Sequence, residues 1–258
     1  MGEDGSGTEP EGRLPPLTAC GVGGAAARST VKPPPDRLYG RARGHRLRAR
    51  QQKLLDVTLP RLAFAPELLT DPLSAFSPRR SKLWVEVGAG SGEHALAQSA
   101  AHAEAGLIAC EVFENGICSL LSRLVPEGGE ATASLPGNLR LWADDARTLL
   151  RLLPENSVDL LFLLFPDPWP KARHAKRRFV HPVLLPVVAR VLKPGAEWRV
   201  ASDDPTYQAW VDEVMGAQSL FDILLHAGER PRGWPPTRYE AKALREERMP
   251  LYWSFKRR

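Results

Sequence analysis

Cysteine is scarce in this sequence, and long apolar segments are missing from it. The chain of 258 residues contains only three cysteines, Cys20, Cys110 and Cys118. Their odd number and the lack of a Cys-x-x-Cys pair argue against a disulfide framework and against a zinc site. No run approaches the roughly 20 apolar residues that a membrane-spanning helix needs. These absences predict a cytoplasmic protein with no bound metal and no membrane partner.

Two stretches near the start each lack a class of residue. Residues 1–36 have few large hydrophobic side chains and are rich in Gly, Pro, Ala and Ser. Such a segment cannot offset its ordering entropy, so we predict a disordered extension. The stretch from Arg37 to Lys53 has no acidic residue but seven Lys or Arg. For residues 37–80 we expect a basic arm followed by an accessory helix, broken near Pro60, that packs on the main domain.

Length and composition allow one α/β domain with extensions. Apolar residues make up 43% of the chain, which is enough for a sizeable core. The formal net charge is +5 and the sequence pI is about 9.3. This balance favours an anionic partner such as a nucleic acid.

Strands and helices alternate from Lys82 onward. We expect strands at 83–87, 107–110, 139–142, 158–165, 197–202, 221–225 and 251–255, with helices at 93–103, 113–124, 182–192 and 206–215. This alternation predicts an α/β fold with a doubly wound, mainly parallel, seven-stranded Rossmann-like sheet and helices on both faces. The last two strands are expected to form an antiparallel hairpin at one edge.

A glycine-rich turn follows the first expected strand. Gly88, Gly90 and Gly92 alternate there, so the backbone can turn tightly and approach a ligand where side chains would collide. Such a turn fits a nicotinamide dinucleotide, a flavin or S-adenosylmethionine. The spacing departs from the dinucleotide fingerprint G-x-G-x-x-G, because Glu93 stands where the third glycine would fall.

Acidic residues lie at or near the carboxyl ends of four successive strands, and ligands of open α/β sheets bind at that edge. Glu111 can accept hydrogen bonds from ribose hydroxyls, and Asp145 can accept one from an adenine amino group. An isolated acid at such a place is as readily a helix cap or a surface residue. Four at equivalent places indicate a cofactor pocket; they are Glu86, Glu111, Asp145 and Asp167.

The segment from Phe165 to Arg178 is the most informative part of the chain. Asp167 stands between two prolines, which hold its backbone, and Trp169 follows as a flat face for a base or for packing. Five Lys or Arg come next, enough to meet a phosphate backbone. A solvated basic loop would explain the charges alone, but it would not explain the rigid acid and tryptophan.

These motifs resemble the bacterial tRNA (guanine-N7)-methyltransferases, a branch of the class I S-adenosylmethionine-dependent methyltransferases. The likeness covers residues from about 38 to 258. The Phe-Pro-Asp-Pro-Trp motif with its following cations is highly specific to that family, whereas the glycine loop is specific only to the class. The remaining matching motifs are Leu192-Lys193-Pro194-Gly195, Ser202-Asp203 before Tyr207, and Thr237-Arg238-Tyr239-Glu240.

The resemblance implies a methyltransferase domain over residues 37–258 that modifies the variable-loop guanine of tRNA, at position 46. It implies S-adenosylmethionine contacts at Glu86, Glu111 and Asp145, beside the loop glycines Gly88, Gly90 and Gly92. Asp167 would be the acidic residue of the catalytic site, where it either stabilises charge in the transition state or only holds the guanine or the cofactor. Substrate contacts are expected at Lys171, Arg173, Asp203, Thr237, Arg238, Tyr239 and Glu240.

The chemistry of guanine N7 suggests how such a site works. N7 carries a free lone pair and no proton, so methyl transfer is an in-line displacement that requires neither a metal nor an obligatory base. Catalysis is then mostly positioning and electrostatics. We expect phosphate contacts from Lys171, Arg173, Lys176, Arg177 and Arg178, and a second contact from an arm with Arg41, Arg43, Arg46 and Arg48.

Other readings remain open at this stage. A small-molecule methyltransferase would share the glycine loop but would not need the cations. A non-enzymatic RNA-binding module would not need four acids at strand ends, and a nicotinamide-dependent oxidoreductase is disfavoured by the glycine spacing. Trp169 is either a base platform or a packing wedge. The protein is either a monomer or a homodimer.

Overall fold

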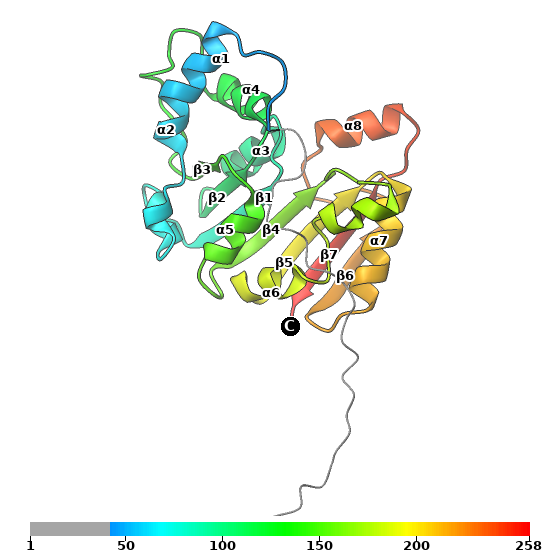
Figure 1. Ribbon diagram of the computed structural model, residues 1–258. Helices are drawn as coiled ribbons and strands as arrows, with labels where there is room; N and C mark the ends of the chain where they lie inside the picture. The colour runs from blue at the N-terminus through cyan, green and yellow to red at the C-terminus, as the bar shows by residue number, and fades with distance from the viewer. Residues whose placement is uncertain (1–41) are drawn as a thin grey trace, which may run out of the picture. The chain divides into compact units, whose positions relative to one another are not determined.

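A seven-stranded sheet organises the part of the chain that the computed structural model describes, residues 42–258 (Figure 1). The predicted disordered extension, Arg37 and Arg41 lie outside the described residues. The strand order is β3-β2-β1-β4-β5-β7-β6; β1 to β5 run parallel, and β7 is antiparallel to both β5 and β6. The strands are β1 Lys82–Val87, β2 Ala105–Cys110, β3 Leu139–Trp142, β4 Val158–Leu164, β5 Leu192–Ser202, β6 Phe221–Ala227 and β7 Leu251–Arg257. The doubly wound, mainly parallel sheet is therefore confirmed.

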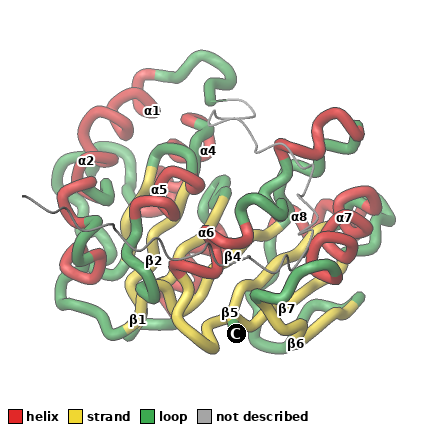
Figure 2. Tube along the Cα trace, turned by 60° about the horizontal axis from the view of Figure 1, so that its bottom comes forward, coloured by secondary structure: helices red, strands yellow, loops and turns green. Residues whose placement is uncertain are grey.

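Helices cover both faces of this sheet (Figure 2). Alternate side chains of β1 enter two separate apolar cores: Leu83 and Val85 enter one, and Trp84 enters the other. The first core receives α5, α6 and α7, and the second receives α3, α4 and the segment from Leu54 to Leu62. The helices are α3 Glu93–Ala101, α4 Glu114–Leu124, α5 Ala146–Leu152, α6 Leu185–Val191, α7 Pro205–Gly216 and α8 Arg238–Arg245. Burial on both faces explains why the central strands read as continuous apolar runs.

Two helices were not predicted from the sequence, and one begins later than expected. Helix α5 is short, and Asp145 caps its start by accepting a hydrogen bond from the Arg147 amide nitrogen. Helix α8 carries mainly polar side chains and buries only Glu240 and Ala243. The helix predicted at 182–192 begins only at Leu185. Short helices such as these take most of their stability from tertiary contacts, so the sequence did not reveal α5, α8 or the first residue of α6.

The last two strands are antiparallel neighbours, but they do not form a hairpin. Strand β7 lies between β5 and β6, and α8 occupies the connection from β6 to β7. The buried aromatic residues Tyr252, Trp253 and Phe255 suit the interior position of β7. Strand β6 stays at the edge, where Ile223 and Leu224 are each 54% exposed. The apolar content of β7 therefore decides which of the two strands is inserted.

The accessory helix is continuous through Pro60, so the predicted break is wrong. Helix α1 Ala49–Lys53 passes into the π-helical η1 Leu54–Thr58 and then α2 Leu59–Leu62. The wider turn lets the Leu59 amide donate to the Leu54 carbonyl, which accommodates a proline that has no N–H of its own. Short 3₁₀ helices follow at η2 Pro66–Leu68 and η3 Pro72–Ala75.

The accessory helix is attached to the edge of the sheet by main-chain and side-chain contacts. Ala63 forms an isolated bridge with Leu141 of β3, and the Phe64 amide donates to the Leu141 carbonyl. Lys53 and Arg50 lie within 2.9 Å and 3.5 Å of the Glu130 carboxylate. The predicted packing of this segment on the main domain is thus present. Among residues 42–258, no helix is both long and apolar enough to cross a bilayer.

Candidate active site

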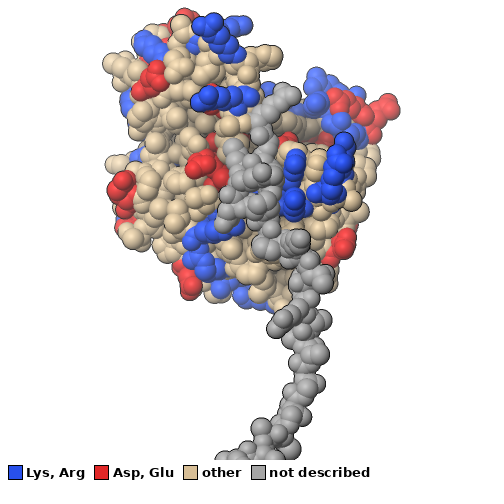
Figure 3. Space-filling view, in the orientation of Figure 1, with Lys and Arg blue, Asp and Glu red and all other residues tan. Residues whose placement is uncertain are grey.

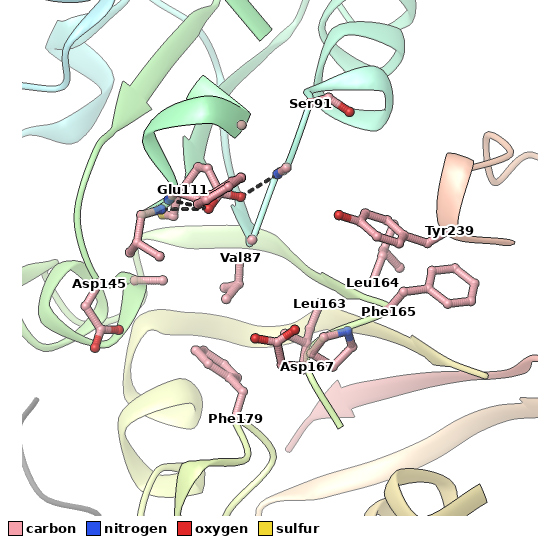
Figure 4. A pocket seen from close by; sticks show the side chains of 18 of the residues that line it. Val87, Ser91, Glu111, Asp145, Leu163, Leu164, Phe165, Asp167, Phe179 and Tyr239 are labelled. Atoms are coloured by element: carbon pink, nitrogen blue, oxygen red, sulfur yellow. Dashed lines mark hydrogen bonds between the residues drawn. The ribbon is translucent and has the colours of Figure 1, made fainter. Parts of the chain in front are cut away.

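A pocket of about 820 Å³ opens at the carboxyl edge of the parallel strands (Figure 4). The segments that follow β1, β2, β3 and β4 line it, and α8 contributes from the far side. Its volume lies within the range typical of pockets that hold a small ligand or cofactor. The topology alone brings these segments together, since parallel strands end at the same edge.

The glycine loop, residues 88–92, forms one wall of this pocket. Gly88, Gly90 and Gly92 have φ angles of +73°, +57° and +80°, in the left-handed region that other residues rarely adopt. Gly88 and Gly90 line the pocket, whereas Gly92 is the N-cap of α3. A Cβ on Gly92 would come within 2.4 Å of the Leu120 side chain. Gly88 and Gly90 therefore keep this wall of the pocket free of side chains, and Gly92 lets α3 pack closely against Leu120.

Glu111 is held rigidly beside the glycine loop. Its Oε2 accepts a hydrogen bond from the Gly90 amide at 2.6 Å, and its Oε1 accepts from the Val112 and Phe113 amides at 2.8 Å (Figure 4). A carboxylate has about four acceptor sites, so capacity remains for a ligand hydroxyl. Burial raises the pKa of Glu111 above its ordinary value; the three amides oppose the rise, and the charge of Asp167 adds to it.

Asp145 also lines the pocket, but its carboxylate is already engaged. It accepts from the Arg147 amide as the cap of α5 and from Arg147 Nε at 3.0 Å. The Asp145 side chain is only 16% exposed. It remains near enough to contact a ligand, with less acceptor capacity left than Glu111.

Glu86 does not line the pocket. Its side chain is buried in the second core, where it forms a 2.9 Å hydrogen bond with Nδ1 of His94. Gln98 lies 3.2 Å from the other nitrogen of that imidazole, and the Phe162 ring packs against it. The pair joins β1 to α3 behind the glycine loop. Three of the four predicted strand-end acids, Glu111, Asp145 and Asp167, therefore line the pocket. The fourth, Glu86, contacts His94 of α3 instead.

The Asp167 loop, residues 165–170, forms the wall opposite Glu111. Asp167 is exposed, lines the pocket and points its carboxylate inward (Figure 4). Phe165 and Trp169 have φ angles of +52° and +46°, an unusual conformation for non-glycine residues. Such conformations persist only where the surrounding contacts enforce them, and they cluster at functional sites.

The basic run after this loop divides into three kinds of residue. Lys171, Arg173 and Lys176 are exposed and do not line the pocket. Arg177 lines the pocket, with its guanidinium 4.7 Å from the centre of the Trp169 ring. Arg178 is only 5% exposed, so the prediction that it grips a phosphate is wrong. Burial, which sequence pattern does not report, separates Arg178 from its neighbours.

The predicted substrate residues near the C-terminus divide in the same way. Arg238 and Tyr239 line the pocket, and Tyr239 lies 3.6 Å from the position of a Cβ on Gly90. Thr237 and Glu240 form the capping box of α8, and buried Glu240 also pairs with Arg230 at 2.9 Å. Asp203 pairs with Arg248 at 2.7 Å. The described geometry brings only two of these five residues, together with Asp167 and Glu111, into one pocket.

Several lining residues were missed by sequence reasoning. Phe113, Asn115 and Ser119 come from the start of α4, and their closeness to Glu111 in the chain was the available signal. Phe179 also lines the pocket, and nothing in the sequence distinguishes it from a core residue. Within residues 42–258, no group of three His, Cys, Asp or Glu is arranged to hold a metal ion.

The donor set of the pocket fits an adenosine-containing cofactor. An oriented carboxylate, Glu111, stands next to a glycine loop whose backbone is open to a ligand, and a Cβ at Gly88 would meet no atom within 4 Å. Asp145 lies at the end of the next strand, where a base of such a cofactor would be reached. Asp167 and Tyr239 border the remaining space and leave room for a second ligand.

Comparison with solved structures shows which class has this fold. The chain resembles the 16S rRNA methyltransferase KamB, with a TM-score of 0.52, 16% identity and coverage of 70% of this chain and 89% of that one. A 16S rRNA (adenine(1408)-N(1))-methyltransferase from Catenulisporales acidiphilia gives a TM-score of 0.50 at 16% identity, covering 75% of this chain and 91% of that one. A family model described as "Putative methyltransferase" matches residues 80–251. Fold and pocket therefore define a Rossmann-like methyltransferase.

Curated relatives define the family within that class. A protein of Granulibacter bethesdensis named tRNA (guanine-N(7)-)-methyltransferase is 65% identical over 89% of this chain and 98% of its own length. The protein of the same name from Rhodospirillum rubrum is 44% identical over 88% of this chain and 90% of its own length. The chain belongs to the tRNA (guanine-N(7)-)-methyltransferase family. This finding confirms the family predicted from the Phe-Pro-Asp-Pro-Trp motif.

Proposed function

We propose that this protein transfers a methyl group from S-adenosylmethionine to N7 of a guanine in the tRNA variable loop, at position 46, and so forms 7-methylguanosine. The observation that carries the proposal is the pocket with two unlike walls. Glu111 and the glycine loop lie on one wall, Asp167 and Arg177 lie on the other, and Tyr239 of α8 lies beside Gly90 between them. Two relatives that cover 89% and 88% of this chain are named tRNA (guanine-N(7)-)-methyltransferase, and these names support tRNA guanine N7 as the target.

Residues beside the glycine loop hold the cofactor in this proposal. Bound S-adenosylmethionine supplies a methyl group that is already activated by its positive sulfur. Glu111 accepts hydrogen bonds from the ribose, because its carboxylate is oriented by three amides. Gly88 and Gly90 let the cofactor approach the backbone, and Asp145 contacts the base. Glu86 contributes through His94 by supporting the loop.

Asp167 has the central role on the opposite wall. Positive charge appears on the purine ring as N7 receives the methyl group. A carboxylate fixed near that ring favours the change, since preorganised charge in a shielded site stabilises the transition state. Phe165 and Trp169, which flank Asp167, have positive φ angles, and we expect this constrained backbone to keep the exposed carboxylate directed into the pocket. Tyr239 and the Trp169–Arg177 pair border the space for the guanine.

Exposed cations around the pocket bind the RNA backbone. Lys171, Arg173 and Lys176 extend outward from the Asp167 loop, and α8 adds a further group of exposed cations, Arg238, Lys242 and Arg245. Figure 3 shows Lys and Arg side chains gathered near α1 and near α8 on one face. N7 lies on a guanine edge that folded RNA hides, so the enzyme must also loosen or flip the base.

The described part of the basic arm lies beside the same pocket. The Glu114 amide donates to the Ala42 carbonyl, and Arg43 pairs with Glu114 at 3.3 Å. Arg46 and Arg48 are exposed. Glu114 begins the helix whose Asn115 lines the pocket, and this neighbourhood supports the proposal that the arm contacts RNA entering there. Residues 37–258 would then act as one methyltransferase domain in the cytoplasm, with 37–80 as arm and accessory helix.

A second candidate is another S-adenosylmethionine-dependent methyltransferase, acting on a different RNA or on a small molecule. It would use the same cofactor wall. The exposed cations on both sides of the pocket favour a nucleic acid over a small molecule. The specific motif around Asp167 favours guanine N7 among RNA targets.

Incubation with labelled S-adenosylmethionine and unmodified tRNA tests the proposal directly. We expect label in 7-methylguanosine after nucleoside analysis, and no label when position 46 of the same tRNA is changed to adenine. Binding of the tRNA should weaken steeply with salt, because several phosphates are contacted. Absence of 7-methylguanosine across a panel of tRNAs would contradict the proposal.

A further inference from the structure

Arg178 differs from every other cation of the basic run. Lys171, Arg173 and Lys176 project into solvent, whereas Arg178 is 5% exposed. A guanidinium at that depth cannot reach the phosphate of a docked RNA without leaving its site. Burying a charged group is unfavourable unless neighbouring groups compensate it. The contacts that compensate Arg178 therefore show what it does.

The guanidinium of Arg178 holds the main chain of the Asp167 loop. Its Nε donates to the Pro168 carbonyl at 3.1 Å, and one Nη donates to the Trp169 carbonyl at 3.1 Å. These are the first two residues after Asp167. Trp169 has a φ of +46°, which an L-residue keeps only under constraint. The planar fork of an arginine matches two successive carbonyls better than a single ammonium group would.

The other side of Arg178 is anchored in α7. Its guanidinium lies 4.9 Å from the centre of the Trp210 ring, and Trp210 donates from its indole nitrogen to the Val180 carbonyl at 2.5 Å. The Val180 amide donates to the fully buried Tyr207 hydroxyl at 3.3 Å. The segment after the basic run is thus clamped to a packed helix. That same helix begins two residues after Asp203.

Charges on α7 also favour the buried guanidinium. Burial lowers the pKa of Arg178, while the nearby Tyr207, Asp204 and Glu213 oppose this shift. The site therefore keeps a cation that takes its compensation from backbone carbonyls, an aromatic ring and carboxylates of the same domain. The contacts of the Arg178 guanidinium thus lie within the protein, on the Asp167 loop and on α7.

We propose that Arg178 is a positioning residue that holds Asp167 in the methyl-transfer pocket by tying the Pro168 and Trp169 carbonyls to α7. The proposal rests on the proposed function, because it assigns Asp167 to catalysis. It removes Arg178 from the RNA-binding surface. It also explains the left-handed backbone conformation of Trp169, because the buried guanidinium donates a hydrogen bond to the Trp169 carbonyl.

The variant Arg178→Lys tests this role. A lysine keeps the charge but loses the two-pronged geometry, so we expect kcat to fall about 10–100-fold, as for a reacting group displaced by about 1 Å. The tRNA Kd should change less than about threefold, and its salt dependence should stay the same, since no phosphate contact is removed. Arg79→Lys is the matched control; Arg79 is exposed and pairs with Asp71 far from the pocket, so kcat should not change.

Lys176→Gln should have the opposite effect, with binding changed and kcat kept, because exposed Lys176 is proposed to contact phosphate. We expect weaker tRNA binding and a salt slope shallower by roughly 0.7–0.9. If Arg178→Lys leaves kcat unchanged, or if Arg178→Gln, which removes the charge, shows this binding pattern with an unchanged kcat, Arg178 does not position Asp167 and the proposal is wrong.

Hydrogen exchange gives a second measurement that does not depend on catalysis. In Arg178→Lys, the amides of the non-proline residues of this segment, Phe165, Asp167, Trp169 and Lys171, should exchange at least about tenfold faster, while those of β1 and β5 keep the wild-type rate. Faster exchange throughout the sheet would mean that Arg178 only supports the core, and unchanged exchange at 165–171 would mean that it does not hold the loop. Either result overturns the proposal. If the wild-type protein makes no 7-methylguanosine, the proposed function fails, but this exchange experiment still tests the Arg178 contact.

Discussion

The glycine loop and the Asp167 loop face each other across the pocket, and they differ in which residues adopt positive φ angles. The glycine loop places three residues at positive φ, and each of them is a glycine. The Asp167 loop places Phe165 and Trp169 at positive φ, although neither is a glycine. One loop presents bare backbone to the pocket, and the other presents side chains to it.

This difference shows where each loop takes its stability from. Glycine adopts a left-handed conformation at no steric cost, so residues 88–92 need few external contacts. A non-glycine residue in that region is disfavoured by roughly 1–2 kcal/mol, and the fold must compensate. The Asp167 loop finds this compensation in its prolines and in buried Arg178. A strained loop that carries functional side chains therefore depends on contacts distant in sequence.

Asp167→Asn should have the largest effect, because it removes the charge from the side-chain loop and keeps its shape. We expect kcat to fall about 10²–10³-fold, which corresponds to about 3–4 kcal/mol of transition-state stabilisation. Single-turnover rates at saturating S-adenosylmethionine and tRNA measure this, and thermal unfolding should remain as in the wild type. Near-normal turnover would show that the Asp167 carboxylate has no electrostatic role.

Gly92→Ala should mainly destabilise the backbone loop. A Cβ there meets Leu120 at 2.4 Å in a residue with φ +80°, so strain and overpacking combine. We expect a loss of about 2–4 kcal/mol in the free energy of unfolding. Gly88→Ala is the matched variant: its φ is +73°, but a Cβ meets no atom within 4 Å, so it should lose only about 1 kcal/mol. Equal losses in chemical denaturation would show that packing against Leu120 does not matter.

Glu111→Gln should weaken cofactor binding with a smaller effect. The amide cannot accept from Gly90 and from the Val112 and Phe113 amides at once, so one contact of the glycine loop is lost. We expect the Kd for S-adenosylmethionine to rise about tenfold, or about 1.4 kcal/mol. Calorimetric titration measures the change. An unaltered Kd would remove Glu111 from the cofactor site.

The pH dependence of Glu111 should give the smallest effect. Burial raises its pKa above the ordinary value near 4.5, so the folded state holds its proton more tightly than the unfolded state. Wild-type stability should therefore fall, relative to Glu111→Gln, as pH rises from about 4.5 through the raised pKa. Cofactor affinity should rise over the same interval, because the carboxylate is the better acceptor. Unfolding free energies and cofactor Kd values should be measured over the same pH series. If stability relative to Glu111→Gln and cofactor affinity both rose or both fell with pH, the prediction would be contradicted.

Sequence reasoning was most successful where a local pattern carries the information. The third expected strand has the observed bounds, and the other six differ by a few residues at their ends. The glycine loop, Glu111, Asp145 and Asp167 were all predicted to lie at one edge, and they line one pocket. This succeeded because parallel strands place their carboxyl ends together whatever the details of packing.

The sequence failed where burial decides the role of a polar residue. Glu86 was predicted to contact the cofactor, yet the structure places it against His94 outside the pocket lining. Thr237 and Glu240 were expected at the substrate, but their side chains cap α8. The Thr-x-x-Glu spacing of a capping box was the signal in the sequence that indicates this role.

The sequence by itself determined the class of sheet, the position of the glycine loop and the family motif around Asp167, since each depends on neighbours in the chain. Only the tertiary structure decided that β7 is inserted beside β5 and that Arg178 turns inward while Lys176 turns outward. The physical reason is that propensity and turn chemistry are local, whereas burial and its compensation come from residues such as Trp210 that the chain brings near only by folding. Two cations of one run therefore have opposite environments, one buried and one exposed.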